Sequence, residues 1–212
     1  MKVSRFTFNM FGVNTYILWD NISKDAIIID PGMVNDSEQK IIDQFIEKNN
    51  LKLSHLVNTH MHIDHAFGVQ YVKNRYNLKF ECNIGDQFLA QRLNEQAAMF
   101  GLPISIEELQ IDVDLKNGDK IYVGDEELQI LQVPGHSPGS IVLYAPQSSF
   151  IISGDVLFNS SIGRTDLPGG SYPQLISAIN EKLMTLPEDV IVYPGHGNET
   201  SIGQEKSNNP YL

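Results

Sequence analysis

The sequence has 212 residues, of which 42% are hydrophobic and 19% charged, a balance typical of one folded domain and unlike that of a disordered chain. Its formal net charge of −11 disfavours nucleic acid as a partner, because an acidic surface repels phosphate backbones. No apolar run approaches the roughly 20 residues of a membrane helix, so we expect no membrane partner. Cys82 is the single cysteine, so we expect no internal disulfide and a cytoplasmic location.

The first half of the chain predicts short strands and three helices. Alternating or apolar runs predict strands at residues 3–9, 14–20, 26–30, 55–58 and 80–84. Asp36 or Ser37 can cap a helix in which Ile42, Phe45 and Ile46 recur at helical spacing. Further helices are expected at residues 66–75 and 86–100.

The second half of the chain also predicts short strands together with a helix. Strands are expected at residues 120–123, 127–133, 140–144, 150–152 and 190–193, and a helix at residues 172–184. Strands and helices alternate with some hairpins, which predicts a mixed α/β sheet sandwich instead of a pure succession of parallel units. No linker or repeat divides the chain, so we expect a single domain over residues 1–212.

Polar clusters follow several of these strands directly. The clusters contain His60 to His65, His136, Asp155 and His196, and two of the histidines stand in Pro-Gly-His sequences. Reactive groups of layered α/β folds gather where strand ends meet at one edge. The pattern therefore predicts one site that is assembled from several strand ends.

The densest cluster is the run His60, His62, Asp64 and His65, which places ligand-type residues at four of six consecutive positions. His-x-His alone is a weak signal, but histidine and aspartate together are what a borderline-soft divalent metal prefers. We therefore predict a metal site here and not a set of surface or core histidines. His55 stands alone before an apolar strand, so we expect a capping or packed histidine there.

Taken together, the motifs resemble those of the metallo-β-lactamase fold superfamily, and within it the short, single-domain members of the glyoxalase II-like (hydroxyacylglutathione hydrolase-like) branch. The resemblance covers the whole chain and is carried by Asn-Thr-Tyr-Ile-Leu at 14–18, Ile-Ile-Asp-Pro-Gly at 28–32 and Gly-Arg-Thr-Asp-Leu-Pro-Gly-Gly at 163–170. It implies a four-layer αββα sandwich of two similar halves. Longer enzymes of the branch continue into a helical domain that contacts glutathione. Residues 198–212 are too short to form that domain, so the identity of the thiol carrier, glutathione or another thiol, stays open.

The resemblance also implies a ligand set for two divalent metal ions. It assigns one metal to His60, His62 and His136, the second metal to Asp64, His65 and His196, and the bridging position to Asp155. Asp30 would orient a ligand histidine. Zinc is the expected metal, and iron and manganese suit such a mixture of histidine and aspartate as well.

The implied activity is hydrolysis of a thioester such as S-lactoylglutathione. Two divalent cations that share a water lower its pKa to about 7, and the resulting bridging hydroxide would attack the carbonyl carbon. Asp64 would act as the catalytic residue that orients the hydroxide and accepts its proton. Arg164 could bind a substrate carboxylate or instead pair with Asp166, and Tyr172 could line the pocket or pack against its neighbours.

Three alternatives remain open at this point. A persulfide dioxygenase shares the scaffold and a Gly-Arg-Thr-Asp-like loop but uses one iron held by two histidines and an aspartate. A non-enzymatic metal-binding protein would have a closed, saturated site. A true β-lactamase is disfavoured, because these enzymes have a cysteine, or no bridging carboxylate, where Asp155 stands.

Overall fold

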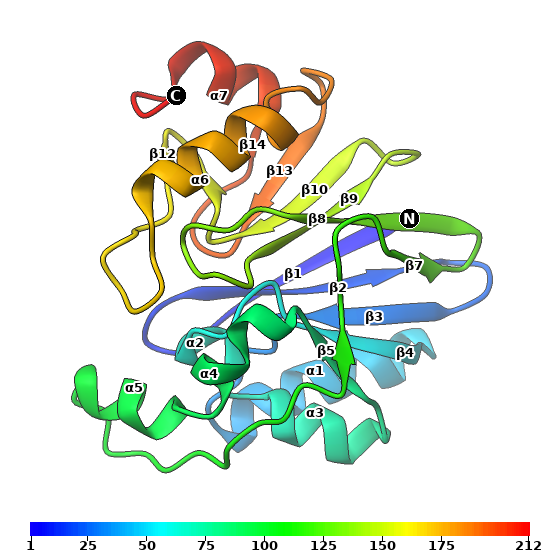
Figure 1. The fold of residues 1–212 in the computed structure, drawn as a ribbon. Coiled ribbons are helices and arrows are strands. Elements are labelled where there is room, and N and C mark those ends of the chain that lie inside the picture. Colours follow the sequence, from blue (N-terminus) through cyan, green and yellow to red (C-terminus); the bar gives the residue numbers. More distant parts are fainter.

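The computed structural model describes residues 1–212 and contains two six-stranded sheets that pack face to face (Figure 1). The strands of the first sheet, in spatial order, are β1 (Lys2–Phe8), β2 (Val13–Trp19), β3 (Asp25–Ile29), β4 (Lys52–Val57), β5 (Phe80–Cys82) and β6 (Val113–Asp114). Strands β1 to β3 pair antiparallel, and β3 to β6 pair parallel. The first sheet is therefore mixed, as the sequence pattern predicts.

The second sheet is also mixed and lies against the first. Its strands, in spatial order, are β14 (Thr200–Ser201), β13 (Ile191–Pro194), β10 (Phe150–Gly154), β9 (Ile141–Ala145), β8 (Glu126–Gln132) and β7 (Lys120–Val123). Only β10 and β13 pair parallel. A small separate hairpin is formed by β11 (Leu157–Phe158) and β12 (Ser161–Ile162).

Helices cover the outer face of each sheet, which completes four layers (Figure 1). The first half contributes α1 (Asp36–Asn49), α2 (Ile63–Ala66), α3 (Val69–Tyr76), a 3₁₀ turn at Ile84–Asp86, α4 (Gln87–Ala90) and α5 (Leu93–Met99). The second half contributes α6 (Tyr172–Ala178), which continues as a π-helical turn at Ile179–Leu183, and α7 (Ile202–Asn208). None of these helices combines the length and the apolar character that crossing a membrane requires.

Three hydrophobic cores lie between the four layers. In β2, Ile17 faces the core under the first-half helices, whereas Tyr16 and Leu18 face the core between the two sheets. A third core packs Leu175 and Ile179 of the second-half helices against the second sheet. Side chains alternate between the two faces of a strand, so a strand that is buried on both faces must be apolar throughout. This explains the continuous apolar runs in the sequence.

Several predicted helix limits are wrong. Neither Asp36 nor Ser37 caps α1; the cap is Asn35, whose extended backbone precedes the first helical residue and whose side chain accepts the Ser37 and Glu38 N–H groups. The helix expected at 66–75 is interrupted near its start: Ala66 ends α2, and α3 begins only at Val69, because the Gly68 N–H donates to the Pro31 carbonyl oxygen at 2.7 Å. A Cβ at Gly68 would lie 2.7 Å from the Pro31 carbonyl oxygen.

The helices expected at 86–100 and 172–184 are also interrupted. The first divides into α4 and α5 at Arg92, whose φ of −120° is not helical. The second changes to π-helical geometry after Ala178. Both remain on the expected stretches of sequence.

Candidate metal centre

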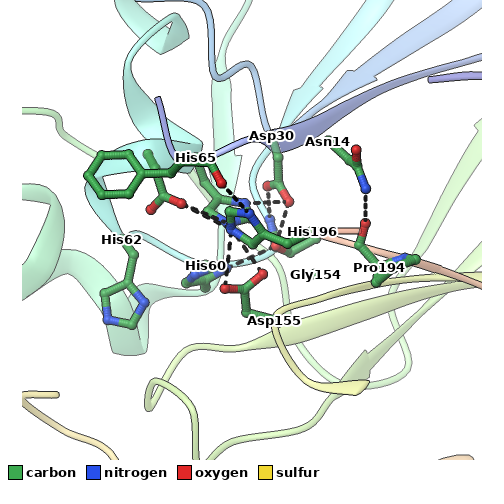
Figure 2. Close-up of polar contacts among 12 residues, drawn as sticks. Asn14, Asp30, His60, His62, His65, Gly154, Asp155, Pro194 and His196 are labelled. Atoms are coloured by element: carbon green, nitrogen blue, oxygen red, sulfur yellow. Dashed lines mark hydrogen bonds and ion pairs between the residues drawn. The ribbon is translucent and has the colours of Figure 1, made fainter. Parts of the chain in front are cut away.

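Side chains that follow strands of both sheets meet at one edge of the sandwich (Figure 2). The loop after β4 brings His60 and His62, and α2, which follows this loop, brings Asp64 and His65. The loops after β8, β10 and β13 bring His136, Asp155 and His196. Potential ligand atoms lie within 4.8 Å of one another in each of three overlapping groups. The structure therefore brings together all seven side chains that the resemblance assigned to metals.

The first group consists of His60, His62 and His136. Nε2 of His136 lies 2.8 Å from Nδ1 of His62 and 3.2 Å from Nε2 of His60. A neutral imidazole has one ring nitrogen with a proton and one with a lone pair. Three nitrogens that face one point at these distances suit a cation between their lone pairs.

The second group consists of Asp64, His65 and His196, and Asp155 lies between the groups. Nε2 of His196 lies 3.0 Å from Oδ2 of Asp64 and 3.3 Å from Nε2 of His65. The Asp155 carboxylate lies 3.4 Å from His65 Nε2, and 3.6 and 3.7 Å from Nε2 of His196 and His136. This mixed set of nitrogen and carboxylate donors fits divalent metals.

Four of the five histidines in the centre have a polar group beside the ring nitrogen that faces away from it, whereas the buried Nε2 of His62 has no partner. The pairs are His60 Nδ1 with Thr59 Oγ1 (3.1 Å), His65 Nδ1 with Asp30 Oδ2 (3.0 Å), His136 Nδ1 with the Arg164 carbonyl oxygen (2.7 Å) and His196 Nδ1 with the Phe11 carbonyl oxygen (3.1 Å). A partner on the outer nitrogen fixes the ring and directs the lone pair of the other nitrogen inward. The arrangement is that of preoriented metal ligands.

Asp30, which the sequence analysis expected to orient a ligand histidine, is buried at the end of β3. Besides its contact with His65, it accepts hydrogen bonds from the Thr59 backbone N–H and hydroxyl, both at 2.7 Å. Its φ is +51°, in the left-handed region. One carboxylate thus joins the end of β3 to the loop after β4.

Burial and charge act differently on the two groups. Burial, reinforced by neighbouring histidines, holds the pKa of His60 well below its usual range and lowers that of His62 to about 3. Burial opposes protonation of His65 too, but the Asp64, Asp155 and Asp30 carboxylates outweigh it and raise the pKa of His65. Burial alone would raise the pKa of Asp155, yet the charge of His65 lowers it. The centre thus combines neutral His60 and His62 with a charged His65 and an ionised Asp155 carboxylate.

A cavity of about 210 Å³ opens beside this centre. It is lined by Phe11, His62, Asp64, Phe100, His136, Asp155, Arg164, Leu167 and His196. Phe11 and Phe100 meet edge to face, with ring centroids 5.5 Å apart. The cavity therefore combines potential metal ligands with an apolar wall.

The two predicted substrate residues differ in position. Arg164 lines the cavity, but its half-exposed guanidinium makes two hydrogen bonds of 2.7 Å to Asp166. Tyr172 is 49% exposed and does not line the cavity. His55 lies apart from the centre, with Nδ1 2.6 Å from Oε1 of Glu81.

The apolar wall and one buried carboxylate, Asp86, are not predicted from the sequence. Phe11 lies between β1 and β2, Phe100 directly follows α5, and Leu167 lies in the Gly-Arg-Thr-Asp-Leu-Pro-Gly-Gly stretch. Neither the expected helix nor that stretch marks these side chains as lining a cavity. Asp86 accepts hydrogen bonds from the loops that contain His62 and His136. It follows β5 closely, so the rule that polar residues gather after strands could have drawn attention to it.

With this geometry in view, the family model described as Metallo-beta-lactamase superfamily matches residues 9–196. The chain belongs to the metallo-beta-lactamase superfamily. Hydroxyacylglutathione hydrolase GloC of Haemophilus influenzae is 38% identical over 100% of this chain and 98% of its own length. This membership makes the chain a metallo-hydrolase with a histidine-rich candidate site for divalent metal.

Solved structures of the superfamily agree with the fold. The BLEG-1 B3 metallo-beta-lactamase superposes with a TM-score of 0.89 at 33% identity, covering 100% of this chain and 99% of that one. TTHA1623 in a di-iron-bound form gives a TM-score of 0.86 at 30% identity, covering 99% and 100%. The four-layer metallo-beta-lactamase sandwich is therefore confirmed.

Proposed function

We propose that this metallo-hydrolase cleaves thioesters of a thiol carrier, in the manner of a hydroxyacylglutathione hydrolase, at a centre of two divalent metal ions. The observation that carries the proposal is the cluster of seven donor side chains beside an open cavity. The 38% identity to GloC over the whole chain supports the thioester as substrate. Zinc is the metal we expect, and the di-iron form of TTHA1623 makes iron the first alternative.

The proposed ligands follow the geometric groups. His60, His62 and His136 would hold one ion, Asp64, His65 and His196 the other, and Asp155 would contact both. Divalent ions held in this way lower the pKa of water to about 7 and polarise a carbonyl oxygen. The residues of the chain must then place the substrate and handle protons.

Asp64 is the residue proposed to handle the proton. Its carboxylate lines the cavity, and Oδ2 lies 3.0 Å from His196 Nε2. Burial would raise its pKa, but the charge of His65 and the hydrogen bond from His196 outweigh burial and lower it. An ionised Asp64 can orient an attacking water and accept its proton.

The other parts of the cavity suit a thioester. Phe11 and Phe100 form an apolar wall that keeps bulk water from the reacting carbonyl. A thiolate leaves readily, because thiols have a pKa of about 8.5, so the site needs no separate protonated acid. Arg164 could hold a carboxylate of the thiol carrier once its guanidinium turns from Asp166.

The test begins with metal-free protein loaded separately with zinc, iron or manganese. Metal content is measured, and the loaded protein is assayed for thiol release from S-lactoylglutathione, for oxygen uptake with a persulfide, and for cleavage of a β-lactam. We expect two metals per chain and thiol release. His136→Ala and Asp155→Ala proteins serve as controls, because each removes a proposed ligand.

The other outcomes contradict different parts of the proposal. Oxygen consumption with one bound iron and no thiol release would favour a persulfide dioxygenase. Cleavage of the β-lactam alone would favour a β-lactamase, the class named for BLEG-1. Two bound metals with none of the three reactions would contradict the thioester as substrate, but would still support the proposed two-metal centre.

A further inference from the structure

Asp86 connects two metal-ligand loops that come from opposite sheets. It ends the 3₁₀ turn after β5 and is completely buried. Its Oδ2 accepts hydrogen bonds from the Met61 backbone N–H at 3.0 Å and from the Ser137 hydroxyl at 2.7 Å. Its Oδ1 accepts one from the Gly139 backbone N–H at 2.6 Å.

These donors stand directly beside ligands of the first group. Met61 lies between His60 and His62 in the loop after β4, and Ser137 follows His136 in the loop after β8. A buried carboxylate with three good donors is well satisfied, and such charge-assisted hydrogen bonds are about twice as strong as neutral ones. Asp86 therefore fixes the distance between two loops that the chain does not join locally.

Close packing shows that this contact leaves little room for adjustment. A Cβ at Gly139 would lie 2.6 Å from the Asp86 backbone nitrogen and 2.7 Å from Oδ1. A Cβ at Gly85 would lie 3.2 Å from the Gly139 Cα. The two turns thus meet backbone to backbone, and a shift of Asp86 must move the loop of His136.

We propose that Asp86 is a positioning residue that sets the separation of His60 and His62 from His136 and so tunes the first metal site selectively. None of its three hydrogen bonds reaches Asp64, His65 or His196. Residues that orient metal ligands typically change metal affinity about 10- to 100-fold when they are replaced. The inference rests on the proposed two-metal centre.

The test is a zinc titration of the metal-free protein against a competing chelator, with Asp86→Asn as the main variant. We expect the affinity for one of two zinc ions to fall about 10- to 100-fold, while the other affinity stays unchanged. Asp43→Asn is the matched control, because Asp43 accepts hydrogen bonds from Tyr71 and Tyr76 between α1 and α3, away from the centre. It should lower the thermal stability of the metal-free protein without changing either affinity.

Double variants show which of the two proposed metal sites loses zinc affinity. In a His136→Ala background, which lacks a ligand of the first site, adding Asp86→Asn should leave the remaining zinc affinity unchanged. In a His196→Ala background, the same addition should weaken the remaining zinc about 10- to 100-fold. Equal weakening in both backgrounds would overturn the selective role.

Two further results keep the test decisive. If Asp86→Asn does not fold, Ser137→Ala removes one of the three hydrogen bonds and leaves the charge in place. Unchanged zinc affinities in Ser137→Ala, or in a folded Asp86→Asn, would overturn the inference. Wild-type protein that binds one zinc would instead contradict the two-metal centre, so the two failures are distinguishable.

Discussion

Arg164 contributes to the site through two different groups. Its carbonyl oxygen accepts a hydrogen bond from His136 Nδ1 at 2.7 Å, and its guanidinium pairs with Asp166. Substitution by alanine removes the guanidinium and keeps the carbonyl. The metal centre and the proposed contact of the guanidinium with substrate can therefore be examined separately at this one residue.

We predict that Arg164→Ala retains its metals but raises KM for S-lactoylglutathione about tenfold with little change in kcat, because the guanidinium would bind the carrier equally in ground and transition states. Steady-state kinetics with metal analysis measures both effects. Asp166→Asn is the control, since it releases the guanidinium from its partner and should not raise KM. An unchanged KM in Arg164→Ala would mean that the Asp166 pair is structural.

At the scale of elements, the start of α1 depends on one side chain. Asn35 accepts the Ser37 and Glu38 backbone N–H groups, which would otherwise lack partners within the helix. We predict that Asn35→Ala lowers the free energy of unfolding by about 1 kcal/mol. Ser37→Ala should lower it less, because the backbone donors and their acceptor remain. Urea denaturation measures both, and equal losses would contradict the assignment of the cap.

The pairing of β4 with β5 carries a pH-dependent contact. The hydrogen bond to Glu81 raises the pKa of His55, although burial opposes it. The stabilisation is present below the unfolded pKa of about 6.5 and is lost as pH rises through the higher folded pKa. His55 is partly exposed, so we expect a loss of about 0.5–1 kcal/mol.

Comparison with His55→Gln isolates this contact from the other histidines. The difference in unfolding free energy between wild type and His55→Gln, followed by urea denaturation above about pH 6, should shrink as pH rises. A constant difference would contradict the contribution of a charged His55.

The elements also show what the sequence could and could not predict. Strands such as β2 and β3 were found because both of their faces are buried, which leaves an apolar run. The break at Gly68 was not found, because its cause is a close approach to Pro31, far away in the sequence. Asp86 was missed for the same reason: its partners Met61 and Gly139 become neighbours only in the folded chain.

For the whole molecule, the centre lies at the seam of the two sheets. Asn14 of β2 in the first sheet donates from its side chain to the Pro194 carbonyl oxygen at 3.0 Å (Figure 2). Its backbone N–H donates to the Gly195 carbonyl oxygen at 2.7 Å. Tyr16 donates to the same Pro194 carbonyl at 2.7 Å. These bonds hold the loop of His196 against the first sheet. The run of candidate ligands at 60–65 could be predicted from a short stretch of sequence. The other candidate ligands, His136, Asp155 and His196, reach it only in the folded chain.

Because both sheets supply ligands, metal should stabilise the whole sandwich and not a single loop. A ligand present at about 100 times its Kd stabilises the folded state by about 2.7 kcal/mol. For a chain of this size that corresponds to a rise in Tm of about 5–10 °C for each ion. We therefore predict that a chelator lowers the Tm of the wild-type protein by about 10–20 °C, the sum for two ions, in one cooperative transition that scanning calorimetry would show. His136→Ala, with one ion left, should show about half the shift. A wild-type Tm that is unaffected by the chelator would mean that the halves associate without help from the metals.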